Sequence, residues 1–155
     1  MLNLASMIPG GFVEVRDFSR YPAVILGCFN LFLTVLGLGS LVLAYFVYAT
    51  ETGYTLTAVV GVGYCAVYLA DLYRIFPISP VPMSTLLNRL EWLGTLLGIA
   101  LVVVGIWARL RHDATSDAAQ SFSISTPILL ILLFFGLIIL AFATRAAMKK
   151  TADPS

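Results

Sequence analysis

The polar side chains best placed for chemistry lie where the second long apolar run ends and the third begins. They are Asp71, Arg74, Asn88 and Glu91. Asp71 lies five residues before Phe76, the last residue of the second run, which corresponds to about 7–8 Å along a helix. At that depth a carboxyl reaches the edge of the hydrocarbon, where ionisable groups are costly and face protein or a water-filled cavity.

These side chains allow two interpretations. In the first, Asp71 and Glu91 form a proton or cation site, and Tyr64 and Tyr68 line a path to it. In the second, they belong to an interfacial ion-pair network in which Asp71 pairs with Arg74, one helical turn later. Buried pairs often fix register or topology and carry no chemistry. We favour the second interpretation, because the site is shallow and arginines are close by.

Helical periodicity places the polar and small residues of each run on one face. On the second run this face carries Tyr64, Tyr68 and Asp71. On the third run Glu91 shares a face with three glycines, which include a G-x-x-x-G pair that favours close helix packing: Gly94, Gly98 and Gly105. The first run has a comparable polar face with Asn30 and Thr34. We therefore expect these faces to contact other helices and not lipid.

The elements that must position these residues are membrane-spanning helices. Hydrophobic residues make up 60% of the 155-residue chain and charged residues 11%, whereas soluble domains contain about 45–50% and about 25%. The mean hydropathy of +0.98 also excludes a disordered chain. Four runs reach the roughly 20 apolar residues that a span needs: 21–50, 55–76, 85–109 and 126–147. The sequence predicts an all-α integral membrane protein with four transmembrane helices in an antiparallel up-down bundle.

The expected organisation is a single transmembrane domain with short flanking segments. Residues 1–20 form an N-terminal arm, residues 21–147 the four-helix domain, and residues 148–155 a cytoplasmic tail. Apolar and charged residues alternate in the arm, so it is expected to lie in the membrane interface or to dock on another subunit.

Lysine and arginine counts predict the orientation. The arm, the second loop with its borders and the tail carry seven basic residues: Arg16, Arg20, Arg74, Arg89, Arg145, Lys149 and Lys150. The opposite side carries two, Arg109 and Arg111. Both termini are therefore expected in the cytoplasm, with the chain in the cell (inner) membrane. Four of these residues are expected to reach lipid headgroups: Arg89, Arg145, Lys149 and Lys150.

Several function classes are disfavoured by composition and motifs. One histidine and two cysteines, both cysteines inside apolar runs, predict no metal site and no cofactor. A net charge of +1 gives no reason to expect nucleic acid as a partner. Walker, Rossmann and metalloprotease motifs are absent from the sequence. We assign no catalytic residue.

Three functions remain, and they differ in whether the chain binds protein partners, transports an ion or acts on a substrate. The favoured one is a non-catalytic subunit or assembly factor of a larger membrane complex. Its partners would be the lipid bilayer and other integral membrane subunits. The alternative is a small homo-oligomeric transporter or channel that uses Asp71 and Glu91. A second alternative is a membrane enzyme that acts on lipid or quinone at the cytoplasmic interface. The fourth run is apolar from Ile128 to Ala143, so a pore would need several copies or a partner.

Overall fold

Four helices make up the fold in the computed structural model, which describes residues 13–148 apart from 15, 17, 19 and 112–124. They are α2 (Ala23–Thr50), α3 (Tyr54–Leu72), α4 (Thr85–Arg111) and α6 (Thr126–Met148). All four are long and apolar enough to cross a membrane. The predicted fold class is therefore confirmed, and the helix bounds differ from the expected ones by a few residues.

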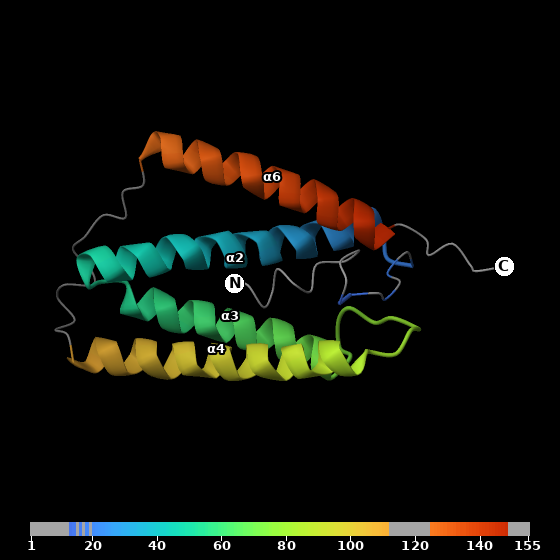
Figure 1. The fold of residues 1–155 in the computed structure, drawn as a ribbon, viewed down its shortest axis with the longest axis horizontal. Coiled ribbons are helices and arrows are strands. Elements are labelled where there is room, and N and C mark those ends of the chain that lie inside the picture. Colours follow the sequence, from blue (N-terminus) through green and yellow to red (C-terminus); the bar gives the residue numbers. More distant parts are fainter. Residues whose placement is uncertain (1–12, 15, 17, 19, 112–124, 149–155) are drawn as a thin grey trace.

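The helices run alternately up and down and form an open row, not a closed ring (Figure 1). α3 and α4 make by far the most extensive contact, α2 packs against α6, and α2 contacts α3 less extensively. α6 lies on the side of α2 away from the α3–α4 pair. The bundle thus consists of a tight pair, α3–α4, and a looser pair, α2–α6.

Glycines allow the backbones of α3 and α4 to touch. A Cβ atom added at Gly61 would lie 2.8 Å from the carbonyl oxygen of Gly98. One added at Gly105 would lie 2.7 Å from the amide nitrogen of Ala58. Close approach of this kind brings two helices into van der Waals contact in a bilayer, where hydrophobicity alone does not hold helices together.

The helix ends are set by local backbone chemistry. Gly53, with φ of +84°, lies in the short turn that joins α2 to α3. α3 ends at Leu72, four residues earlier than expected, and Arg74 follows with a left-handed φ of +54°. At the start of α4 the hydroxyl of Ser84 accepts a hydrogen bond from the N–H of Leu87 at 3.1 Å. Serine is one of the residues favoured at an N-cap, because its hydroxyl satisfies a free N–H group of the first helical turn.

The described part of the N-terminal arm packs against the chain's own helices. Phe18 and Leu26 are 3% and 2% exposed and form a small apolar cluster with Tyr21. The ring of Tyr21 meets that of Phe76 edge-on at 5.3 Å, and its hydroxyl accepts a hydrogen bond from the N–H of Ile78 at 2.8 Å. The arm thereby contacts the start of α2 through Phe18, and Tyr21, which follows the arm, contacts the α3–α4 connection. The prediction that the arm lies in the membrane interface or docks on another subunit stays a prediction.

Candidate functional site

A buried ion pair joins the arm to α3. Arg16 donates from Nη1 to Oδ1 of Asp71 at 2.7 Å and from Nη2 to Oδ2 at 2.6 Å. The two side chains are only 5% and 10% exposed. The planar guanidinium matches both carboxylate oxygens at once, which makes this one of the stronger hydrogen-bonding arrangements in proteins.

The same guanidinium also binds Glu14. Its Nε and Nη2 donate to the two Glu14 carboxylate oxygens at 2.9 and 2.6 Å, and the backbone N–H of Arg16 adds a bond at 3.0 Å. Burial by itself lowers the pKa of Arg16, but the hydrogen bonds to Asp71 and Glu14 outweigh it and raise that pKa above its ordinary value. Arg16 is therefore a permanent positive charge.

Glu91 brings a third carboxyl to this place from α4. It is 3% exposed, and its carboxyl lies close enough to Asp71, Arg16 and Glu14 to interact with them. Within the part of the chain that the structure describes, its Oε2 atom has no hydrogen-bond partner. We call these four residues, Glu14, Arg16, Asp71 and Glu91, the Arg16 cluster.

The charges of the Arg16 cluster do not balance. With every group ionised, three carboxylates surround one guanidinium, which leaves two uncompensated negative charges in a buried place. A buried charge without a partner is costly, and proteins neutralise or pair such groups. The cluster can therefore accept a positive charge.

Only two of the four residues that the sequence analysis predicted for this site lie together in the structure. Asp71 and Glu91 meet, whereas the side chains of Arg74 and Asn88 are exposed. The expected pair between Asp71 and Arg74 does not form; Asp71 pairs with Arg16 through both carboxylate oxygens. The left-handed turn at Arg74 also takes that residue off the end of the helix.

Sequence reasoning missed Glu14 and Arg16 as members of the site. Arg16 counted only toward membrane orientation, and the alternation of apolar and charged residues in the arm suggested a surface segment. The one available signal was that a charged segment stands directly before the first span. It can therefore fold back on the membrane edge where Asp71 emerges.

The tyrosines nominated on α3 pack between helices. Tyr64 and Tyr68 are buried and their rings stack at 6.1 Å between centroids. The Tyr64 hydroxyl shares a hydrogen bond with that of Ser40 at 2.9 Å, which connects α3 to α2. The Tyr68 ring occupies the space that a side chain at Gly94 would need. Both rings therefore fill contacts between helices.

The polar face of α2 connects to α6. The amide of Asn30 donates to the hydroxyl of Thr144 at 3.2 Å, and the hydroxyl of Thr34 donates to the backbone carbonyl of Asn30 at 2.7 Å. Among the residues expected at headgroups, Arg89 and Arg145 are exposed. Lys149 and Lys150 lie outside the described residues.

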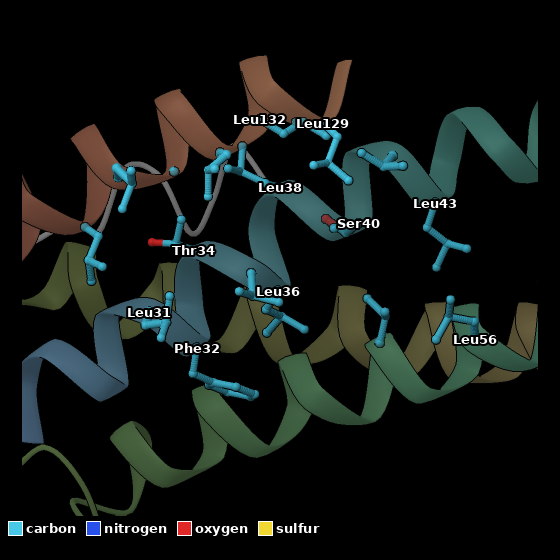
Figure 2. Close-up of a pocket in the computed structure, with 18 residues that line it drawn as sticks. Leu31, Phe32, Thr34, Leu36, Leu38, Ser40, Leu43, Leu56, Leu129 and Leu132 are labelled. Carbon is cyan, nitrogen blue, oxygen red and sulfur yellow. The ribbon is translucent and has the colours of Figure 1, made fainter. Parts of the chain in front are cut away.

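An apolar groove of about 580 Å³ lies between α2 and α6. Figure 2 shows leucines from both helices on its walls, with Leu56 contributed by α3. The hydroxyls of Thr34 and Ser40, which also line the groove, are already bonded within the protein. The groove therefore suits an apolar occupant.

The described residues contain no group of three or more side chains able to hold a metal ion. Cys28 is exposed, and the thiol of Cys65 contacts the backbone carbonyl of Thr95 at 3.7 Å. Both cysteines lie inside helices that are apolar enough to span a membrane.

Residues 1–121 match the family described as "Domain of unknown function (DUF8051)", and the chain belongs to this family. The match includes the arm, α2, α3, α4 and all four residues of the Arg16 cluster, and it ends before α6. No curated protein and no solved structure matches the chain.

Proposed function

We propose that this chain is a non-catalytic subunit of a larger membrane protein complex, and that it receives a transmembrane helix of its partner in the α2–α6 groove. The observation that carries the proposal is a glycine in the groove wall whose Cβ position is not contacted by any other helix. A Cβ atom at Gly39 would meet nothing within 4 Å, although Gly39 lines the groove. Small residues in spanning helices mark the places where another helix approaches closely.

The glycines of the α3–α4 pair show what an occupied position looks like. At Gly61, Gly98 and Gly105 the backbone of the opposing helix lies within about 3 Å of an added Cβ atom. Gly27, which lines a second apolar groove between α2 and α6, is open like Gly39. The α2–α6 pair thus offers helix-packing positions that the chain itself leaves unused.

The exposure of α6 also supports a partner helix. Only 6% of the apolar stretch of α6 is buried, whereas 28% of the apolar stretch of α4 is buried. Its contact with the remainder of the chain is mainly with α2. A helix seated in the groove would cover α6 and α2 together and would place its own small residues over Gly39.

Several buried polar groups serve internal contacts, which supports a structural role. Arg16 binds Asp71 and Glu14, and the buried hydroxyl of Tyr64 bonds with Ser40. Such bonds hold segments of the chain to one another.

The test is to fill the groove and follow the partner. Gly39→Leu should fold but lose the proteins that co-purify with the wild type in mild detergent. Val103→Leu, at a 60% exposed position on α4, is the matched control and should retain them. Helical circular dichroism and elution as a single species verify folding in both. Equal recovery of partners with both variants would contradict the proposal, and so would purification only as a homo-oligomer.

A homo-oligomeric transporter is the second candidate, and the buried carboxyls of Asp71 and Glu91 favour it. Liposomes containing the wild type and Asp71→Asn distinguish the two functions. We expect no intrinsic proton or cation flux from either protein, together with a loss of detergent-stable assembly in Asp71→Asn. Clear wild-type flux that disappears in a well-assembled Asp71→Asn variant would replace our proposal with the transporter.

A further inference from the structure

The unpartnered oxygen of Glu91 marks the place where the Arg16 cluster is incomplete. The residue is 3% exposed and its Oε2 atom has no hydrogen-bond partner among the described residues. A carboxylate oxygen in that position would be a buried negative charge without a donor, which is far more costly than a neutral carbonyl oxygen in the same place.

The neighbouring carboxyl shows which of the two acids is neutral. Both oxygens of Asp71 accept hydrogen bonds from Arg16, at 2.7 and 2.6 Å, so Asp71 is the carboxylate. The carboxyls of Glu91 and Asp71 lie close enough to interact. Two carboxyls can share a hydrogen bond only if one of them carries a proton and donates it. That proton belongs on Glu91.

We propose that the Arg16 cluster is a proton-binding site in which Glu91 holds one proton and donates a hydrogen bond through it to Asp71. The N-terminal arm closes over these two carboxyls only while the proton is bound. The site goes beyond the proposed subunit role and does not depend on it. With the proton, the cluster carries one net negative charge; without it, two. The second charge would fall beside Asp71, the residue that anchors the arm.

Three charged groups face Glu91 from the elements packed against it. Arg16 and Glu14 face it from the arm, and Asp71 faces it from α3. The tyrosines Tyr64 and Tyr68 lie on the same α3 face. Arg16 does not lose its charge, because its pKa is raised further above an already high ordinary value.

The direction of the pH effect follows from where the proton is bound. The closed arm holds it, and the open, hydrated site holds it less tightly. Closure is therefore complete at low pH and is lost as pH rises. For a single proton, the equilibrium constant for opening rises by at most about tenfold per pH unit.

Opening of the arm can be followed by trypsin cleavage after Arg16. This side chain is 5% exposed and held by two carboxylates, so cleavage requires the arm to leave the cluster. The full chain is used in detergent micelles and carries Arg20→Gln, because Arg20 is exposed and would be cut without opening. Glu91→Gln, measured in the same background at each pH, keeps the neutral shape and removes the titration. The ratio of the two cleavage rates cancels the pH dependence of trypsin itself.

We expect the wild-type rate, divided by that of Glu91→Gln, to rise with pH by up to about tenfold per unit. Glu51→Gln, at an exposed position in the α2–α3 turn, is the matched control and should follow the wild type. A ratio that stays constant from low to high pH would overturn the proposal. If sodium or calcium closes the arm again at high pH, the site binds a metal cation and our assignment of a proton is wrong.

Infrared spectroscopy tests the same site without relying on any variant to fold. At a pH where the wild-type arm is closed, the spectrum should contain the C=O band of a protonated, hydrogen-bonded carboxyl. The band should disappear over the pH range in which cleavage after Arg16 accelerates. Absence of the band while the arm is closed would show that Glu91 is ionised and would refute the proposal.

Discussion

Replacing Arg16 by glutamine should detach the N-terminal arm and destabilise the fold. Two buried carboxylates, Glu14 and Asp71, would lose the cation that holds them. Removing one partner of a buried ion pair costs about 3–5 kcal/mol, because the other charge is left uncompensated. The arm can lift and admit water, which limits this loss. We therefore expect the free energy of unfolding to fall by about 2–3 kcal/mol.

Arg20→Gln is the matched control for this change. Arg20 belongs to the same arm and carries the same charge, but its side chain is exposed. Substitutions at such positions change stability by less than about 0.5 kcal/mol. Any effect that depends only on the net charge of the arm, or on its attraction to anionic lipid, would appear equally in both variants.

The assay is unfolding in mixed micelles with increasing sodium dodecyl sulfate, followed by helical circular dichroism. The double variant Arg16→Gln with Asp71→Asn isolates the pair. If the two residues act through each other, the double variant should be less destabilised than the sum of the single variants, by about 1–3 kcal/mol. Equal stability of Arg16→Gln and Arg20→Gln, or strict additivity of the two single changes, would refute the geometry described above.

Three further predictions concern packing and orientation. Gly105→Ala should lower the free energy of unfolding by about 1–3 kcal/mol, because the new methyl group would meet the backbone of α3, whereas Gly39→Ala should raise it by up to about 1 kcal/mol in the isolated chain. Tyr64→Phe should cost about 0.5–1.5 kcal/mol in the same unfolding assay through the lost bond to Ser40. With both native cysteines replaced by alanine, a cysteine at Glu51 should react with an impermeant maleimide from outside the cell. Reaction only from the cytoplasmic side would reverse the predicted orientation.

Helical periodicity and composition were sufficient to predict the four spans and the faces they bury. Tyr64, Tyr68 and Asp71 lie on the buried face of α3, as their spacing indicated. Glu91, Gly94 and the other glycines of its face are buried on α4. These predictions succeed because a spanning helix has a fixed period and must satisfy its backbone internally. Spacing along the sequence therefore becomes direction in space.

The partner of Asp71 could not be predicted by the same reasoning. A helix-based argument looks for partners one turn away and so selects Arg74. Arg16 stands 55 residues before Asp71 in a segment outside the helices, and no periodic signal records where such a segment folds. The loss of helical geometry at Arg74, which has a φ of +54°, could not be predicted either. Arg16, although more distant in sequence, is the partner of Asp71 because its buried guanidinium binds the carboxylates of Asp71 and Glu14 at once.

The contacts between the two helix pairs explain why the arm matters to the entire fold. Within the α3–α4 pair, backbone packing at glycines is extensive and would survive the loss of any single polar bond. Between α2 and α3 the contact is slight by comparison, and Ser40 of α2 shares a hydrogen bond with Tyr64 of α3. The bond of Arg16 to Asp71 adds a connection from the arm to α3. Because the arm leads directly into α2, the bond between Arg16 and Asp71 fixes one end of α2 against the α3–α4 pair.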